Sequence, residues 1–414
     1  MTPSAEPTLL DRRDERLKDG SGALGALKAF LDRVRSGDLG SLPVVVGLVV
    51  IWTIFETLNP IFLSPNNLVN MLFDCSTVGV ISLGIVCVLM VGEIDLSVGS
   101  VSGLASALLG VIWVSLGWPV GIAILAPLIV GCLIGCVYAS LFNRLGMPSF
   151  VSTLSGLLAF LGLQLYILGP TGSINLPYGS ALVNFGQLMV MPHWISHTLA
   201  ALPGIFALVL GYRNAQRRQA AGLSSRSLGG LVLQAVLMVA AFEAVTAYLN
   251  RSRGVPWMFG LFVGLVVAMD YALKRTQWGR SMTAVGGNRE AARRAGINVR
   301  AVYMSAFALC ATLAAAGGVL SAARLASSSQ QAGTGDVNLN AIAAAVIGGT
   351  SLFGGRGSAY SALLGMIVIQ SIASGLTLLD LSSSLRYMIT GCVLAVAVIV
   401  DSLARRSRVS HGRA

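Results

Sequence analysis

Long apolar stretches alternate with short polar or glycine-rich ones from residue 42 almost to the end of the chain. A helix needs roughly 20 mainly apolar residues to cross a bilayer. The pattern predicts about twelve segments, at 42–63, 70–91, 98–117, 119–142, 149–168, 195–212, 228–249, 256–273, 303–323, 339–350, 358–378 and 385–403. The stretch 339–350 is too short to cross alone, so we interpret it as a half-helix or as a continuation of the preceding loop. The expected fold is all-α: a polytopic integral membrane protein with about 10–12 transmembrane helices.

Composition supports this fold, because 55% of the 414 residues are hydrophobic and only 11% are charged. Soluble domains carry roughly 25% charged residues, and fewer charges cannot cover a water-facing surface. Residues 1–22 are polar and lack the apolar core of a signal peptide. From Ala23 to Arg35 apolar residues recur at helical spacing, which suits a helix on the membrane surface or one that binds a partner. We expect an N-terminal tail at 1–40, a transmembrane domain at 41–404 and a basic tail at 405–414.

The positive charges predict the orientation. With the N-terminus inside, the basic stretches 213–226 and 274–302 and the C-terminal tail all fall inside, and only Arg251, Arg253 and Arg324 fall outside. This is the bias of the positive-inside rule, so both termini are expected in the cytoplasm. The net charge of +11 could also indicate nucleic-acid binding. We expect none, because no aromatic residues are interleaved with a basic surface.

The chain lacks the residues for an ATPase or an enzyme site. A phosphate-binding loop needs Lys after a Gly-rich turn, but Lys18, Lys28 and Lys274 each follow Leu. If ATP drives this protein, another polypeptide must hydrolyse it. No Ser/His/Asp set or paired carboxylates of catalytic type emerge, and no cofactor is expected in this chain. The six cysteines lie in or beside apolar runs and suit packing better than a disulfide framework or a metal site.

The first candidate motif, GEIDLSVGS, covers Gly92 to Ser100 between two apolar runs. Its ionisable groups could be functional, because charges near lipid are costly. Alternatively, Asp95 caps the next helix by accepting backbone N–H bonds, and we favour this structural role. The candidate residues of this motif are Glu93, Asp95, Ser97 and Gly99.

The second motif, GGNREAARRAGI at Gly286 to Ile297, lies in the basic loop 274–302. Asn288 is placed to begin a short helix, and Gly296 is placed to end it. Such a helix, with exposed charges, could dock a partner, or the stretch could be an ordinary solvated loop. The candidate docking residues are Gly286, Gly287, Asn288, Glu290, Ala291, Ala292, Arg293, Arg294 and Gly296.

The third motif, AIAAAVIGGTSLFGGRGS, covers Ala341 to Ser358. Non-helical backbone at membrane depth survives only where protein or a water cavity surrounds it. The stretch could therefore line a substrate path, or it could be a compact cytoplasmic turn. Its candidate residues are Gly348, Gly349, Thr350, Gly354 and Gly355.

In this order, the three motifs resemble those of the permease subunits of bacterial ABC importers for pentoses and related sugars. Glu290, Ala291, Ala292 and Gly296 resemble the core of the coupling motif of such permeases, whose downstream Ile and Leu-Pro are not evident here. PSFVSTLSGLLAF at Pro148 to Phe160, RSRGVP at Arg251 to Pro256 and the extra segments at 195–249 resemble the xylose-type permeases.

The resemblance implies the ABC importer permease fold and the import of a monosaccharide, with xylose or a related pentose the expected substrate. It also implies an ATPase subunit that uses ATP and Mg²⁺ and docks at the 286–296 helix. The further partners it implies are a periplasmic sugar-binding protein and a second permease copy.

The main alternative is an ion-coupled secondary sugar transporter, which would use carboxylates at mid-membrane. Glu56 and Glu243 lie within predicted spans and are the candidates for that role. Asp74 and Asp270 lie near predicted span ends, where snorkelling or helix capping would explain them.

Overall fold

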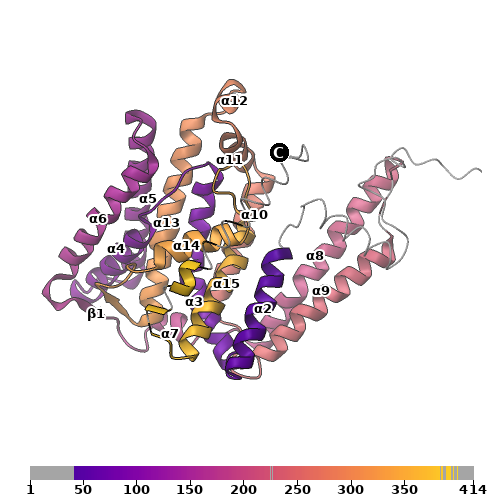
Figure 1. Ribbon diagram of the computed structural model, residues 1–414, viewed down its shortest axis with the longest axis horizontal. Helices are drawn as coiled ribbons and strands as arrows, with labels where there is room; N and C mark the ends of the chain where they lie inside the picture. The colour runs from indigo at the N-terminus through magenta and orange to yellow at the C-terminus, as the bar shows by residue number, and fades with distance from the viewer. Residues whose placement is uncertain are drawn as a thin grey trace, which may run out of the picture. The chain divides into compact units, whose positions relative to one another are not determined.

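The computed structural model describes residues 42–223, 225, 227–382, 384, 385, 388–392, 395 and 399, and these are mainly helical (Figure 1). The predicted tails 1–40 and 405–414 lie outside the described residues, and the predicted segment 385–403 is described only at scattered positions. The first half contains α2 (Leu42–Leu58), α3 (Pro65–Met90), α4 (Val98–Gly110) with the π-helix η2 (Val111–Ser115), α5 (Val120–Leu145), α6 (Ser149–Leu168), η3 (Gly169–Thr171), β1 (Ser173–Asn175), α7 (Ala181–Gln187) and α8 (His193–Ala220). The second half contains α9 (Leu228–Leu249), α10 (Trp257–Arg275), α11 (Gln277–Gly287), α12 (Arg289–Arg294), α13 (Val299–Leu325), β2 (Ser327–Ser329), α14 (Val337–Ile347) and α15 (Ala359–Leu378).

Within the described residues, nine helices are long and apolar enough to cross a membrane, and the shorter apolar helices α2 and α14 accompany them. The all-α, polytopic prediction is therefore confirmed. The short run predicted at 339–350 is the 11-residue α14, which is too short to cross a bilayer alone.

The described residues divide into two compact units, of which 191–255 forms the smaller. This unit is a hairpin of α8 and α9 packed against each other. Inside it, Nδ1 of His197 lies 2.6 Å from a carboxylate oxygen of Glu243, and the amide nitrogen of Asn250 lies 3.1 Å from the other ring nitrogen. Glu243 therefore has a local hydrogen-bonding partner within the hairpin.

In the larger unit, α13 is the central helix and packs along α5, α3 and α4. Small residues allow this close approach, as expected where lipid gives helices no hydrophobic reason to associate. A methyl group built on Gly84 of α3 would lie 2.9 Å from the carbonyl oxygen of Cys310. On the other side of α13, a methyl group on Gly135 of α5 would overlap the backbone of Phe307 and Ala308.

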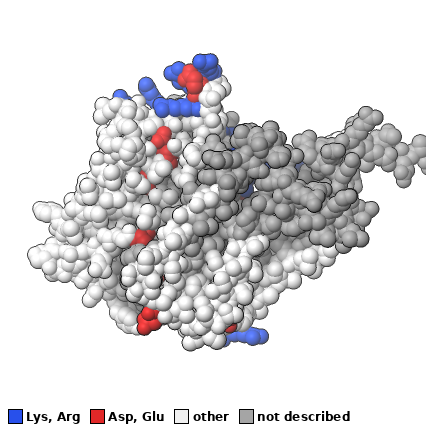
Figure 2. Space-filling model, viewed as in Figure 1, with Lys and Arg blue, Asp and Glu red and all other residues white. Residues whose placement is uncertain are grey.

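The two ends of the larger unit differ in structure. One end, which we call the α12 end, carries α11 and α12. The opposite end carries α7 and a two-stranded ladder in which β1 pairs antiparallel with β2, Ser173 opposite Ser329 (Figure 1). The sequence pattern did not predict α7 or the ladder. Figure 2 shows Lys and Arg gathered mainly at the α12 end, while the middle of the visible face is largely uncharged.

Two carboxylates are placed differently from the sequence-based expectation. Asp74 lies inside α3 and accepts a 2.8 Å hydrogen bond from Nε of Arg324 on α13, so snorkelling or capping does not explain it. Glu56 lies in the last turn of α2, where its carboxylate accepts a 2.9 Å bond from the Leu63 N–H. Both groups stabilise the packing or turns of the helices.

Replacement of Gly135 by Leu tests the packing of α5 on α13. Because the added side chain would overlap α13 backbone, the change should lower the free energy of unfolding by roughly 1–3 kcal/mol. Heating detergent-solubilised protein and measuring the fraction that stays monodisperse would show the loss. Gly162→Leu on α6 is the matched control, since nothing lies within 4 Å of its added Cβ. Equal melting of the two variants would contradict this description of the core.

Candidate functional site

The three motifs meet at the α12 end. The N–H of Gly355 donates a 2.9 Å hydrogen bond to the carbonyl of Met90, the last residue of α3. A methyl group on Gly354 would lie 2.7 Å from the carbonyl oxygen of Gly286 and 2.9 Å from Cα of Gly92. The end of α3, the end of α11 and the 351–357 turn are therefore in direct backbone contact. We call this three-way contact the glycine junction.

The residues around the glycine junction form a compact turn rather than an open channel lining. The Ser351 N–H donates a 3.0 Å bond to the carbonyl of Arg356 and closes the turn. Gly354 and Gly355 have φ values of 80° and 73°, which residues other than glycine rarely adopt. Upstream, Gly348 packs against Ser361, Gly349 has a φ of 105°, and Thr350 is buried. Of the two readings of the third motif, the structure favours the compact turn.

The second motif forms the predicted short helix. The Asn288 side chain accepts a 2.9 Å bond from the N–H of Ala291 and begins α12. At the other end Gly296 has a φ of 84°, and the Ile297 N–H bonds the carbonyl of Ala292 at 3.1 Å. These are the expected start and stop signals of a helix. Gly287 ends α11, and no other group lies within 4 Å of the Cβ it would carry.

The charged side chains of α12 are exposed, whereas Ala292 is buried against the rest of the unit. Glu290 accepts hydrogen bonds from Arg293 at 3.0 Å and Arg294 at 3.2 Å. These two bonds lower the pKa of Glu290, so the helix presents a mixed charged surface at neutral pH. Such a surface is suited to docking a polar partner.

Arg289 attaches α12 to the helices beneath it. Its guanidinium lies 5.3 Å from the ring centroids of both Phe142 on α5 and Tyr303 on α13. Cation–π contacts of this kind contribute roughly 0.5–1 kcal/mol at exposed sites. The sequence analysis did not single out Arg289, because Phe142 comes from a distant segment and Tyr303 comes from a different helix.

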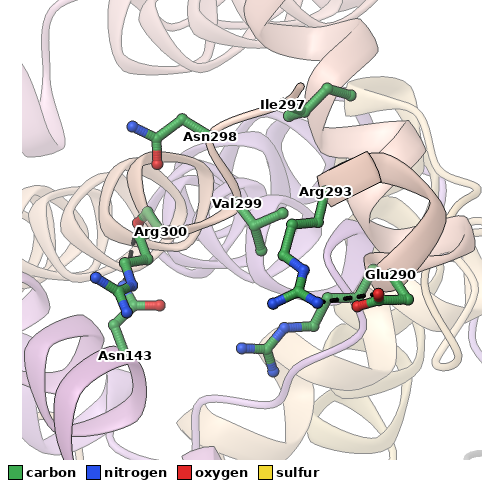
Figure 3. A pocket seen from close by; sticks show the side chains of 8 residues that line it. Asn143, Glu290, Arg293, Ile297, Asn298, Val299 and Arg300 are labelled. Carbon is green, nitrogen blue, oxygen red and sulfur yellow. Dashed lines mark hydrogen bonds and ion pairs between the residues drawn. The ribbon is translucent and has the colours of Figure 1, made fainter. Parts of the chain in front are cut away.

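A cavity of about 560 Å³ opens beside α12 (Figure 3). It is lined by Asn143, Arg289, Glu290, Arg293, Ile297, Asn298, Val299 and Arg300. Three of these residues are arginines, and the Asn143 amide donates a 3.1 Å bond to the carbonyl of Arg300 across its edge. The cavity is therefore basic and continuous with the exposed face of α12.

The first motif links the α12 end to the interior. The Glu93 carboxylate accepts a 2.5 Å bond from the Ser149 hydroxyl at the start of α6. Burial raises the pKa of Glu93, and the Ser149 bond and the Arg289 charge oppose that shift. Glu93 thus lies in electrostatic reach of the first residue of α12.

Asp95 is fully buried and forms a turn, so the helix cap that we favoured for it was wrong: Ser97 occupies the N-cap position of α4. One carboxylate oxygen accepts bonds from the N–H of Ser97 at 2.8 Å and from its hydroxyl at 2.7 Å. This is an Asx-type turn two residues long, and it precedes the first residue of α4. The N–H of Gly99 then donates to the side-chain oxygen of Asn338 on α14, a partner that no sequence pattern indicated.

Within the described residues, no group of three or more His, Cys, Asp or Glu side chains could hold a metal ion. The cysteines described are all free thiols.

The sequence pattern of the family described as "Branched-chain amino acid transport system / permease component" matches residues 67–398. The chain is 34% identical to the xylose transport system permease protein XylH of Escherichia coli, over 93% of this chain and 96% of that protein. It is 31% identical to XylH of Haemophilus influenzae, over 89% and 98% of the two chains. It is 29% identical to the ribose import permease protein RbsC of Escherichia coli, over 86% and 92%. No solved structure matches the chain.

The chain therefore belongs to this permease-component family, and the resemblance found in its motifs is confirmed. A permease component is a translocation subunit, so the protein is not an enzyme. It is a multi-pass membrane protein.

Replacement of Gly286 by Ala tests the glycine junction. The added methyl group would overlap the carbonyl oxygen of Met90 and lie 2.5 Å from the Gly355 nitrogen. We expect the free energy of unfolding to fall by roughly 1–3 kcal/mol, measured as a lower melting temperature in detergent. Gly287→Ala, one residue away with open space around its Cβ, should leave the melting temperature nearly unchanged. If both variants melted at the same temperature, the three segments of the glycine junction would not be in backbone contact.

Proposed function

We propose that this chain is the membrane-spanning subunit of an ATP-driven importer for a pentose, with xylose as the first candidate. The observation that carries this proposal is the 34% identity to a xylose transport system permease over 93% of the chain. The family description names branched-chain amino acids, but the similar curated proteins are named for xylose and ribose. Likeness over nearly the full length to sugar permeases is the closer guide to the substrate.

The proposed assembly contains two copies of this chain, a cytoplasmic ABC ATPase and a periplasmic sugar-binding protein, in the bacterial inner membrane. ATP and Mg²⁺ would bind to the ATPase, and this chain would hold no cofactor. Both termini and the α12 end would lie in the cytoplasm. The concentration of Lys and Arg at the α12 end supports that orientation (Figure 2).

The exposed helix α12 is the proposed docking point for the ATPase. Its charged face and the adjoining basic cavity suit a polar protein surface. Closure of the ATPase would move α11 and α12. Because Gly286 contacts the end of α3 and the 351–357 turn, that movement would reach both motifs that lead into the membrane. Alternating access of a central path would follow.

The ion-coupled alternative has little physical support. Such a carrier needs a carboxylate whose proton or ion exchanges at mid-membrane. Glu56 bonds the Leu63 N–H near the end of α2, and Glu243 bonds His197 within the separate hairpin unit.

Reconstitution of the complete importer into vesicles tests the function. Uptake of labelled xylose should require ATP together with the ATPase and the binding protein, and it should be unaffected when the proton gradient is collapsed. Uptake that follows the proton gradient without ATP would overturn the proposal. Uptake of branched-chain amino acids instead of pentoses would overturn the assigned substrate.

A variant with Glu290→Ala, Arg293→Glu and Arg294→Glu tests the docking point. Loss of the charged surface should reduce ATP-driven uptake at least roughly tenfold while the protein still inserts in the membrane; a tenfold change corresponds to about 1.4 kcal/mol. Pull-down of the ATPase by the permease should weaken in parallel. Arg144→Glu, an exposed arginine at the end of α5, is the control and should leave uptake near the wild-type value. Normal ATPase binding by the triple variant would remove α12 from the coupling mechanism.

A further inference from the structure

Between β2 and α14 the chain does not cross the membrane as a helix. Residues 330–336 are non-helical and run antiparallel along α4. At the β-ladder end, the Ser328 hydroxyl donates a 2.6 Å bond to the carbonyl of Ser106. Further in, a methyl group on Gly103 would overlap the carbonyl oxygen of Ala332, and one on Gly99 would lie 2.5 Å from that of Gly333. We call residues 330–336 the re-entrant segment.

The inner end of the re-entrant segment lies within the length of α13 that crosses the bilayer. Gly318 of α13 packs directly on the backbone of Ser102, and Gly318 lies seven residues before Leu325, where α13 ends. At about 1.5 Å per residue, Ser102 is about 10 Å from that end. Gly99 is three residues deeper, at about 15 Å. Because the 27-residue α13 is about 10 Å longer than a hydrocarbon layer of about 30 Å, this point lies inside that layer.

The re-entrant segment is held in place by one buried amide. Nε2 of Gln164 on α6 donates to the carbonyls of Ser329 at 3.0 Å, Gln330 at 3.3 Å and Ala332 at 3.0 Å. Gln164 is completely buried. It satisfies backbone acceptors that a helix would otherwise have satisfied internally, which the bilayer interior requires.

Six polar side chains lie along the re-entrant segment and the first turn of α14: Gln330, Gln331, Thr334, Asp336, Asn338 and Asn340. Asn338 is engaged by the Gly99 N–H. We call Gln331, Thr334, Asp336 and Asn340 the polar strip. Gln331 is exposed and the other three are partly exposed. The Asn340 amide donates a 2.8 Å bond to the Asp336 carboxylate, and within the described residues no cation is paired with Asp336.

A surface of this kind cannot face lipid. Ionisable groups inside a membrane face a protein interior or a water-filled cavity, and irregular backbone at that depth is tolerated only in the same places. The side of the polar strip that is exposed in a single chain must therefore face water, solute or another protein surface.

We propose that the polar strip contacts the sugar as it passes through the membrane. This inference rests on the proposed function, since it assigns the residues that meet the substrate of that importer. A pentose presents hydroxyl groups that both donate and accept hydrogen bonds. The carboxylate of Asp336 accepts, and the exposed amide of Gln331 offers both donors and an acceptor, whereas the Asn340 amide holds the Asp336 carboxylate in place. Without a cation or a closed pocket, the strip holds a neutral polyol weakly, and a path requires weak binding so that the solute can leave.

Uptake and ATP hydrolysis in the reconstituted importer test the proposal. Asp336→Asn keeps the size of the side chain but removes its charge, and Gln331→Leu removes an amide. Each should lower xylose uptake about tenfold, with ATP hydrolysis within about twofold of wild type, and should change the ratio of xylose to ribose uptake. Ser155→Ala, on the exposed face of α6, should change none of these. Wild-type rates and ratios in both strip variants would overturn the inference while the proposed function stood, whereas a wild-type importer that moves no pentose would remove the proposed function itself.

Thiol labelling provides a second test, which measures the accessibility of one position and does not depend on the transport rate of the variant. In the assembled importer, a membrane-impermeant thiol reagent should label Gln331→Cys above the background of the native cysteines, and saturating xylose during turnover should slow that labelling. Ser155→Cys should not be labelled. Absence of labelling at position 331, or labelling that xylose leaves unchanged, would overturn the proposal. Disulfide-linked copies formed through Gln331→Cys would assign the strip to an interface between copies and would overturn it as well.

Discussion

The structure depends on how it satisfies backbone N–H and C=O groups where the chain is not helical inside the membrane. Each unsatisfied group in hydrocarbon costs several kcal/mol. The chain leaves helical geometry before α4 and again before α14, and the two breaks are neighbours: Gly99 at the start of α4 donates its N–H to Asn338 at the start of α14. Side chains satisfy other backbone groups at each break. Before α4, Asp95 and Thr153 accept backbone N–H bonds, and before α14 Gln164 donates to backbone carbonyls.

The same two segments also reach the α12 end. The linker before α4 begins at Gly92, and the chain after α14 turns through Gly354 and Gly355. Gly354 and Gly355 lie against Gly286 at the end of α11, and Gly92 lies against Gly354. Because these contacts are between backbones and not between flexible side chains, a displacement of α11 cannot be absorbed locally. Under the proposed coupling, it would be transmitted to the linker before α4 and to the turn after α14.

The sequence was informative where local chemistry determines the structure. Apolar run lengths predicted the spans, and Asn288 and Gly296 predicted the two ends of α12, because capping depends on residues within a few positions of one another. Contacts between distant segments were not predictable. The Asp74–Arg324 pair, the contact of Arg289 with Phe142 and the role of Gln164 each join groups more than 100 residues apart, and periodicity carries no information about such partners. Asp95 lies between these cases: its structural role was foreseen, but its bond to Ser97 forms a turn instead of a cap.

The distribution of polarity separates two tasks within one chain. At the α12 end the charges are numerous, exposed and paired on the helix surface, as with Glu290 and its two arginines, so they can meet a protein partner without a large desolvation cost. In the re-entrant segment the polar side chains are few and mostly neutral. Their backbone is hydrogen-bonded by Gln164 and packs against the glycines of α4. A strongly charged or fully enclosed site there would trap a solute. Under the proposed function, a rigid backbone that carries a few neutral donors and acceptors and the single carboxylate of Asp336 would lower the barrier to a polyol without binding it tightly.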